Sequence, residues 1–556
     1  MGGFGYTAGW MTDPNIVLGI DLGTTNSACA VVQDGRASVV RRGEDRIVPS
    51  VIAALSNGEI VVGSEAKLQR AIDPAQVVYS AKRLIGRRFS SPEVQRMMRS
   101  MPYRIVEGNN ESVMIEVGSR RLSVVEISSL ILKYLRQMAE EALGRRVKKA
   151  VIAVPANFTD SQRSATRIAA RLAGLDVIRV INEPTAAALA YGYIEDMDRR
   201  IAVYDFGGGT FDVTLLQITR NVFEVLSTSG EMFLGGDDVD AVILERMAAV
   251  YMQQHGVDLR GDPRAMEQLR AVAEQVKIQL SETSHSSIRV PNVPPGSNRD
   301  LEFSLSEAEL RNIAGTIVRR TIPVCEDAMR VAGVGASQID EIVLVGGTTR
   351  LPIVREVIQE IFGKPPQTSI NPMSVVAVGA AIQGAALLGS LVPMASGGVS
   401  MPSMAQSAVL LDVTPRSLGV GTIGGNVDFI IERNSVIPVE QTRVFTTTTD
   451  NQRYVRIQVC QGESSSFDGN TKLGEILLTG LREAPRGSVS IAVTFEINTD
   501  GLLEVRALDQ DTGQEQVATM RVLGGLPQDE VEAIMARAQE LRGPGDGSVA
   551  RRGGGV

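Results

Sequence analysis

Short apolar runs alternate with helical patterns from residue 16 to about residue 388. This alternation is typical of an α/β architecture, in which helices cover a mostly buried sheet. Four apolar runs predict buried strands, at residues 16–20, 150–154, 201–205 and 342–345. A helix is predicted between the second and third runs, because apolar residues recur there at helical spacing, namely Ala165, Ile168, Ala169 and Leu172. Gly174 predicts the end of this helix. The pattern therefore predicts an α/β domain over residues 16–390.

The pattern changes beyond residue 406. Apolar and polar residues alternate at 455–459, 489–497 and 503–507, and turns containing glycine separate these runs. Such alternation predicts an antiparallel sheet with one buried face. Residues 390–406 are rich in Gly, Ser, Met and Pro, which favours a linker between two domains. We expect a β domain over residues 413–522, with residues 391–412 as the linker.

The two ends of the chain have patterns of their own. Residues 1–15 lack the basic start and long apolar core of a signal peptide, which predicts a flexible extension. Residues 527–541 predict a helix, because a proline and two acidic residues open the segment and an apolar stripe continues to its end. The Gly-rich segment 543–556 follows, so residues 523–556 are expected to be a helical stub and a disordered tail.

Composition narrows the class of protein. The 556 residues carry a net charge of −8 at pH 7 and a pI near 5.3. This argues against nucleic-acid binding, which calls for a basic surface. The three cysteines, Cys29, Cys325 and Cys460, lie far apart without the spacing of metal ligands. They indicate free thiols in a reducing cytoplasm.

One stretch has the length of a membrane span. No charged residue occurs between Lys364 and Asp412, and residues 375–393 within this stretch are largely apolar. Glycine, glutamine and serine residues dilute its hydrophobicity, and no cluster of lysine or arginine flanks it. A buried helix of small residues is the favoured interpretation, and no membrane association is expected.

Glycine-rich motifs give the first indication of chemistry. The chain lacks the GxxxxGK[ST] loop of one large class of nucleotide hydrolases. A single GxGxxG match, formed by Gly419, Gly421 and Gly424, lies in the β region, and the sequence after it does not open a helix. Turn glycines of a hairpin are therefore favoured over a dinucleotide site.

Two other segments each combine a strand end with an acidic residue, glycine and threonine, at residues 21–26 and 205–212. Glycines let backbone N–H groups approach phosphate oxygens. Asp21 and Asp205 suit a hydrated Mg²⁺ ion, which prefers few carboxylates and several waters. Residues 346–350 add a Gly-rich turn suited to adenosine. The three segments in this order predict a nucleotide site.

Together with Ile-Asn-Glu-Pro-Thr-Ala-Ala at 181–187, these segments resemble the phosphate, connecting and adenosine motifs of the actin, sugar-kinase and heat-shock chaperone superfamily. Lys-Arg-Leu-Ile-Gly-Arg at 82–87 and Val-Pro-Ala at 154–156 narrow the resemblance to the DnaK, or heat-shock protein 70, family over residues 16–541. The resemblance implies a two-lobed actin-like (ribonuclease H-like) ATPase domain, then an antiparallel β-sandwich and a short helical stub. It also implies a monomeric cytoplasmic stress-response chaperone that binds and releases extended apolar segments of unfolded polypeptides under the control of ATP hydrolysis.

The resemblance assigns roles to residues of the nucleotide site. Lys82 would orient the attacking water at the γ-phosphate, and Glu183, Asp205 and Thr210 are the other implied catalytic residues. Asp21 and Asp205 would hold Mg²⁺ through water, and K⁺ is expected as a second cation. The implied residues that bind ATP or ADP are Gly23, Thr24, Thr25, Asn26, Gly207, Gly208, Gly209, Gly235, Gly236, Glu274, Lys277, Ser281, Gly346, Gly347, Thr348 and Arg350.

The resemblance also implies coupling between the domains and binding of peptide. The expected partners, besides unfolded polypeptides, are a J-domain (DnaJ-like) co-chaperone and a GrpE-like nucleotide exchange factor. The implied coupling residues, including an apolar linker at 408–412, are Pro155, Arg163, Arg179, Asn182, Thr185, Leu410, Leu411 and Asp412. The implied peptide-binding residues are Val420, Ile423, Phe445, Thr448, Val455, Ile457 and Ile491. Ile457 and Ile491 fit the core of the β domain equally well.

The chain departs from the family's pattern at several positions. Asn157 stands near Pro155 where tyrosine is usual, and residues 373–374, Met-Ser, replace an acidic pair. Ile423 and Thr448 replace the methionine and alanine that are usual over the pocket in bacterial relatives. The family's lid is a helical bundle, whereas a single helix is predicted after the β domain here. We therefore expect a mostly uncovered peptide site with fast exchange.

Other functions on the same fold remain open. A sugar or acetate kinase would use the same nucleotide motifs, but the apolar linker and the β domain favour the chaperone. An actin-like scaffold is disfavoured because the residues implied in hydrolysis are all present. A chaperone that serves a single client is also compatible with the sequence.

Overall fold

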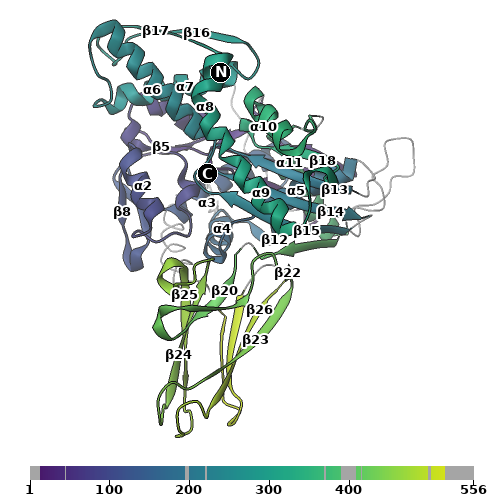
Figure 1. Cartoon of the computed structure of the whole chain (residues 1–556). Helices are drawn as coiled ribbons and strands as arrows, with labels where there is room; N and C mark the ends of the chain where they lie inside the picture. The colour runs from purple at the N-terminus through teal and green to yellow at the C-terminus, as the bar shows by residue number, and fades with distance from the viewer. Residues whose placement is uncertain are drawn as a thin grey trace, which may run out of the picture.

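The computed structural model describes residues 13–43, 45–194, 199–219, 222–368, 371–389, 409–414, 416–498 and 503–519. Two α/β lobes form the upper part of the molecule in Figure 1, and an all-β domain lies below them. The predicted N-terminal extension up to residue 12, the segment 390–408 and the predicted helix at 527–541 lie outside the described residues.

The first lobe is built on a sheet of order β12-β11-β1-β2-β3. These strands are β1 (Val17–Asp21), β2 (Asn26–Gln33), β3 (Arg36–Val39), β11 (Lys149–Val154) and β12 (Asp176–Asn182), and β4 (Val48–Pro49) pairs with β2. Strands β1, β11 and β12 are parallel, whereas β2 and β3 are antiparallel to their neighbours. The predicted strands at 16–20 and 150–154 are thereby confirmed, and both are buried on the two faces of the sheet.

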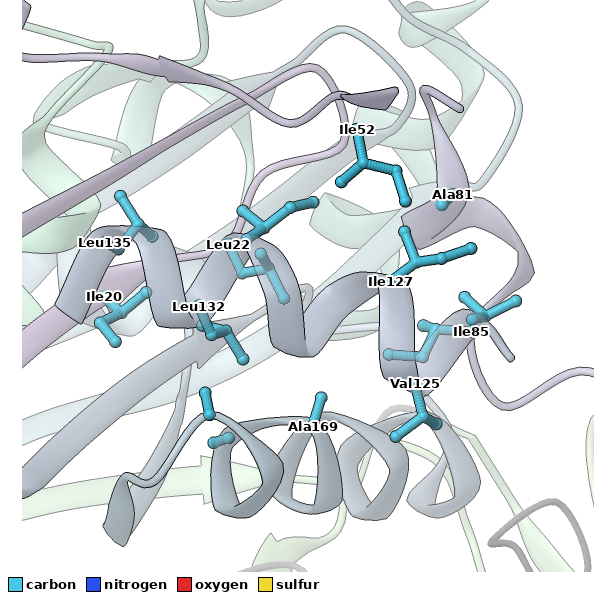
Figure 2. Packing of buried hydrophobic residues seen from close by; sticks show 14 of the residues in the cluster. Ile20, Leu22, Ile52, Ala81, Ile85, Val125, Ile127, Leu132, Leu135 and Ala169 are labelled. Carbon is cyan, nitrogen blue, oxygen red and sulfur yellow. The ribbon is translucent and has the colours of Figure 1, made fainter. Parts of the chain in front are cut away.

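Two helices, α3 (Val124–Leu143) and α4 (Asp160–Leu172), pack on this sheet. Leu132 and Leu135 of α3 and Ala169 of α4 join Ile20 of β1 in one buried cluster (Figure 2). Helix α3 begins where it does because a capping box forms between Ser123 and Glu126, whose carboxylate accepts the Ser123 N–H at 2.7 Å. The predicted helix at 165–172 is confirmed, and it forms the C-terminal part of α4.

Small elements extend the first lobe at its outer edge. They are β5 (Ile52–Ala54), β6 (Ile60–Val62), β7 (Val77–Val78), β8 (Ile105–Glu107), β9 (Val113–Val117), β10 (Arg120–Ser123), α1 (Ser64–Leu68) and α2 (Pro92–Ser100). Two short 3₁₀ turns, η1 (Gln69–Ala71) and η3 (Ala81–Leu84), lie in the same region.

The second lobe is built on the strands β18, β13, β14 and β15 in that order. Their bounds are β13 (Arg199–Phe206), β14 (Phe211–Thr219), β15 (Val222–Glu231) and β18 (Glu341–Val345). The further elements are α6 (Gly236–His255), α7 (Pro263–Gln279), β16 (His285–Val290), β17 (Leu301–Ser306), α8 (Glu307–Arg319), α9 (Thr321–Ala332) and α10 (Pro352–Phe362). The predicted strands at 201–205 and 342–345 are confirmed as β13 and β18, which are parallel neighbours.

The stretch of membrane-span length folds as the predicted buried helix, α11 (Val375–Leu387), which packs against α5 (Glu183–Ile194) and strand β1. Small residues permit this close packing. A Cβ atom at Gly379 would lie 1.7 Å from the carbonyl oxygen of Ala186, and one at Gly19 would lie 2.1 Å from the Ala381 nitrogen. Within the described ranges, no helix is long and apolar enough to cross a membrane.

The all-β domain consists of two four-stranded sheets that enclose their own core. One sheet contains β21 (Val427–Ile431), β20 (Leu418–Gly421), β24 (Tyr454–Gln461) and β25 (Thr471–Thr479). The other contains β23 (Val439–Thr446), β26 (Ser490–Ile497), β27 (Leu503–Asp509) and β28 (Glu515–Thr519). The predicted alternation is confirmed in β26, where Ile491, Val493, Phe495 and Ile497 join the core. Of the GxGxxG glycines, Gly424 forms the turn, whereas Gly419 and Gly421 lie in strand β20.

A short strand, β19 (Val409–Val413), connects the two parts of the molecule. It pairs in parallel with β15 of the second lobe, and it pairs antiparallel with β22 (Val436–Ile437) of the β domain. The second-lobe sheet therefore continues through β19 to β22. The segment predicted as an apolar linker is thus a strand docked on the second lobe in this structure.

Candidate functional site

A pocket of about 80 Å³ lies where the ends of the first strands of the two lobes face each other. The sequence-predicted residues that line it are Asp21, Gly23, Thr24, Thr25, Asn26, Lys82, Glu183, Asp205, Gly207, Gly208, Thr210, Gly346 and Gly347. They come from both lobes and from segments more than 300 positions apart in the chain. The three Gly-rich segments found in the sequence are therefore brought together at one site.

The centre of this pocket is an ion pair between Lys82 and Glu183. Lys82 Nζ donates to Glu183 Oε1 at 2.7 Å, and both side chains are about nine-tenths buried. Lys82 is placed by the 3₁₀ turn η3 and lies 5.4 Å from the centre of the Phe158 ring. Glu183 is the first residue of α5 and follows strand β12 directly. The lysine is thus held in place by a carboxylate on the other side of the pocket.

Buried carboxylates outnumber cations here. Burial, together with the charge of Glu183, raises the pKa of Asp21 to about 7 and the pKa of Asp205 well above its ordinary value. Burial and Glu183 also raise the pKa of Asp212 to about 7. Lys82 opposes all three shifts, but a single lysine leaves negative charge uncompensated. The donor set therefore fits a bound cation.

The carboxylates suit a hydrated cation better than a directly ligated one. Within the part of the chain that the structure describes, no three acidic, histidine or cysteine side chains converge as a direct metal site. Mg²⁺ keeps several of its waters and takes one or two carboxylates, so Asp21 and Asp205 would hold it through water. A cation there would also favour ionisation of both carboxyl groups.

Asp212 is a residue of this pocket region that sequence reasoning missed, although it closes the predicted segment 205–212. Asn157 Nδ2 donates to Asp212 Oδ1 at 2.5 Å, and both side chains are buried. The cross-strand neighbour of Asp212 is Gly230, where a Cβ atom would lie 2.0 Å from Asn157 Nδ2 and 2.4 Å from Asp212 Oδ1. The glycine thus leaves space for the contact between Asn157 and the carboxylate.

Close packing of glycines shapes the walls of the pocket. A Cβ atom at Gly208 would lie 1.9 Å from Thr25 Oγ1 of the other lobe. Gly346 has φ +85°, in the region that favours glycine, and its Cβ atom would meet the Phe206 carbonyl oxygen at 2.4 Å. Larger residues would push these backbone segments apart and widen the pocket.

Lys277 and Thr348, two residues predicted to bind ATP, contact the glycine-rich backbone beside the pocket. Lys277 Nζ donates to the Gly236 carbonyl oxygen at 3.1 Å and to Asp240 Oδ2 at 2.8 Å. Thr348 Oγ1 donates to the Gly207 carbonyl oxygen at 2.8 Å. The predicted ATP-binding residues that do not line the pocket are Gly209, Gly235, Gly236, Glu274, Lys277, Ser281, Thr348 and Arg350. Arg350 lies in the turn after β18 with its Nη2 at 3.5 Å from Asn371 Oδ1.

A second cavity, of about 170 Å³, lies between the lobes and includes Glu274. Glu274 forms an ion pair with Lys67 of the first lobe at 2.7 Å. Beside it, Arg70 Nη2 donates to Glu267 Oε2 at 2.9 Å, and Tyr79 OH donates to Glu267 Oε1 at 2.9 Å. These three buried side chains join the outer edge of the first lobe to helix α7 of the second lobe. The sequence patterns did not predict this cluster.

A chain of hydrogen bonds leads from the edge of the pocket between the lobes to the interdomain strand. Arg163 Nη2 donates to the Ala156 carbonyl oxygen at 3.2 Å, next to Pro155, and to Asn182 Oδ1 at 2.6 Å. Asn182 Nδ2 donates to Asp412 Oδ2 of β19 at 2.5 Å. Because Asn182 precedes Glu183 in the chain, the relay starts one residue from the carboxylate that pairs with Lys82. Four of the predicted coupling residues therefore lie together.

The other predicted coupling residues surround this relay. Burial raises the pKa of Asp412, while Arg163 and Arg179 act in the opposite direction. Thr185 is buried, and its hydroxyl has no hydrogen-bond partner within the described ranges. The backbones of Leu410 and Leu411 pair with Phe223 and Glu224 of β15.

A further contact between the domains was not predicted. Arg433 of the β domain donates to both carboxylate oxygens of Asp327 on α9, at 3.2 and 3.3 Å. The adjacent Asn434 accepts the Thr228 N–H of β15 at 3.1 Å. No motif marked these residues, because the contact depends on how the two domains meet.

The β domain contains a groove of about 850 Å³. All seven predicted peptide-binding residues line it, namely Val420, Ile423, Phe445, Thr448, Val455, Ile457 and Ile491. Ile457 and Ile491 are buried and belong to the core of the domain as well as to the lining of the groove, so a role in binding peptide stays a prediction for both. Ile423 is 77% exposed, which is unusual for an apolar side chain of this size and leaves it available to a ligand.

The family model described as Hsp70 protein matches residues 17–545. The match runs through both lobes, the docked strand and the β domain, so it covers every site described above. Hsp70 proteins are chaperones and ATPases that use nucleotide and Mg²⁺ and bind unfolded polypeptides and co-chaperones. The chain belongs to the Hsp70 family.

Proposed function

We propose that this protein is an ATP-dependent chaperone in which ATP hydrolysis controls the binding and release of extended apolar segments. The observation that carries the proposal is the relay from Arg163 through Asn182 to Asp412. It joins the residue next to Glu183 to the strand that leads into the β domain. A small-molecule kinase on this fold has no use for such a connection.

The proposed reaction transfers the γ-phosphoryl group of ATP to water. Lys82 orients the water and compensates charge that develops on the phosphoryl oxygens, while Glu183 fixes the lysine at 2.7 Å. Asp21 and Asp205 would hold a hydrated Mg²⁺, which would supply charge neutralisation, and Thr210 would offer its hydroxyl to phosphate. The second cation is K⁺, which the surplus of buried carboxylates supports. Catalysis of this kind depends on positioning more than on covalent chemistry.

Release of peptide follows from two states of strand β19. In the docked state the strand extends the second-lobe sheet, and Arg433 and Asn434 hold the β domain against it. Undocking breaks the contact between Asn182 and Asp412 and frees the β domain. Nucleotide and peptide can then bias the same equilibrium from their two sites.

The partners follow from the same surfaces. A J-domain co-chaperone would bind around Arg179, Asn182 and Asp412, where docking of β19 is decided. A GrpE-like exchange factor would act on the contacts between the lobes at the cleft. The three cysteines are buried and unpaired, which supports a reducing compartment such as the cytoplasm.

Steady-state hydrolysis tests the proposal against a kinase. Labelled ATP should give free phosphate, and an apolar peptide should raise the turnover rate several-fold, because peptide and nucleotide share one equilibrium. Transfer of label to a sugar or to acetate, with no effect of peptide, would instead support the kinase.

A further inference from the structure

Asp237 lies where three segments around the nucleotide pocket meet. It stands in the first turn of α6, and its backbone N–H donates to the Gly208 carbonyl oxygen at 2.8 Å. Its carboxylate bonds to the first lobe, where Thr25 Oγ1 donates to Oδ1 at 3.3 Å and Ser80 Oγ donates to Oδ2 at 3.1 Å. A single side chain of the second lobe therefore bonds to two separate segments of the first lobe.

Ser80 has an unusual conformation for a serine. Its φ is +55°, in the left-handed region that residues with a Cβ atom rarely adopt. Ser80 precedes the turn η3, yet its hydroxyl makes no capping hydrogen bond to that turn, which is the usual role of a serine in this position. The side chain is buried and donates to Asp237 instead. The contact between the lobes thus accompanies a backbone conformation that needs support from its surroundings.

Arg83 attaches the turn η3 to the same part of the second lobe. Its Nη2 lies 3.6 Å from Asp237 Oδ2 and 3.5 Å from the Gly208 carbonyl oxygen. The arginine is buried, and a Cβ atom at Gly209 would lie 2.7 Å from its Nε. Lys82 precedes Arg83 in η3. A shift of η3 relative to the second lobe would break these contacts, and Lys82 would move with the turn.

We infer that Asp237 is a positioning residue for ATP hydrolysis, which fixes the turn η3 across the cleft and thereby places Lys82. This role rests on the proposed hydrolysis and adds a residue to it. Asp237 acts through Ser80 and Arg83 rather than on the phosphate or the water. Catalysis by positioning is sensitive to such support, because a displacement of about 1 Å can lower a rate about 10²-fold.

Hydrolysis of ATP that is already bound, followed in a single turnover, isolates the chemical step from binding and release. Asp237→Ala removes the carboxylate and should slow this step about tenfold. Its affinity for ATP should stay close to the wild-type value, because the residues implied in binding ATP are retained. Ser80→Ala removes one hydroxyl that donates to the carboxylate and should slow the same step about fivefold. Urea unfolding of each variant shows whether it is folded, and Ser80→Ala carries the test if Asp237→Ala is not.

Two further variants distinguish the contact from its surroundings. The double variant with Ser80→Ala and Asp237→Ala should be no slower than Asp237→Ala alone, because both changes remove one shared contact. Effects that multiply would show that the two residues act independently, and would overturn the inference. Ser80→Gly suits the positive φ but lacks the hydroxyl, so it should be as slow as Ser80→Ala. A wild-type rate in Ser80→Gly would also overturn the inference.

The matched control is Lys67→Gln, which removes the 2.7 Å ion pair with Glu274 across the same cleft and leaves Asp237 in place. It should keep the wild-type rate in a single turnover. If Lys67→Gln slowed the step as much as Asp237→Ala, closure of the lobes in general would set the rate, and the inference would be wrong. A wild-type rate in Asp237→Ala overturns the positioning role and leaves the proposed function standing. If the wild-type protein hydrolyses no ATP, the proposed function fails and the positioning role fails with it.

Discussion

Asn182 Nδ2 donates to Asp412 Oδ2 at 2.5 Å, and this contact joins the edge of the nucleotide pocket to the strand between the domains. The same asparagine accepts a hydrogen bond from Arg163 at 2.6 Å. The side-chain amide of Asn182 therefore accepts one hydrogen bond through Oδ1 and donates another through Nδ2. An aspartate at this position could accept from Arg163 but could not donate to Asp412.

The variant Asn182→Asp tests the relay. It places a second carboxylate against Asp412, so the like charges should disfavour the docked strand. We expect stimulation of ATP hydrolysis by peptide to fall at least about fivefold, in line with the loss of one charge-assisted contact. The ratio of turnover with and without peptide measures this. Full stimulation in the variant would mean that coupling does not pass through Asn182.

Docking of β19 should depend on pH. The docked environment raises the pKa of Asp412 through burial, whereas in an undocked, solvated strand it would titrate near its ordinary value. Docking then takes up a proton between the two values, so it is favoured at low pH and weakens as pH rises through the raised pKa. Energy transfer between labels on the two domains would follow the docked fraction. Asp412→Asn removes the titrating group, and a wild-type profile identical to that of this variant would rule the mechanism out.

Helix packing between the lobes depends on Gly379. The variant Gly379→Ala should destabilise the nucleotide domain by about 3 kcal/mol, because backbone atoms of α5 occupy the space of the new methyl group. Gly261→Ala is the matched control, since nothing lies within 4 Å of a Cβ atom there. Urea unfolding measures both. Similar losses for the two variants would argue against the close helix contact.

The buried cluster around Glu267 should slow the release of ADP by holding the lobes together. Glu267→Gln keeps the shape of the side chain but leaves Arg70 and Arg270 without their buried counter-charge. We expect ADP to dissociate about tenfold faster, measured by the release of a labelled nucleotide. The control is Glu245→Gln, which alters the exposed pair with Arg260 and should leave the release rate unchanged. If Glu267→Gln released ADP at the wild-type rate, the cluster would contribute to the stability of the fold and not to the rate of ADP release.

The sequence predicts the parts of this molecule that lie in continuous segments. The Gly-rich segments at 21–26, 205–212 and 346–350 contain their chemistry within a few residues, so their convergence could be anticipated. The same holds for the alternating strands of the β domain. Their periodicity follows from one buried face.

Contacts that depend on the meeting of distant segments escaped prediction. The interaction of Asn157 with Asp212 requires space left by Gly230, and the pair of Arg433 with Asp327 forms only when the domains dock.

The most direct test of the account is the rate at which a bound fluorescent apolar peptide is released when ATP is added in a stopped-flow instrument. The account predicts that ATP accelerates release at least about tenfold in the wild-type protein, because nucleotide and peptide act on the same docked strand. Asn182→Asp should release the same peptide with little response to ATP. Lys82→Ala should turn over ATP about 10²-fold more slowly, as expected when a group that stabilises developing charge is lost. Release that is equally fast with and without ATP in the wild-type protein would contradict the central claim.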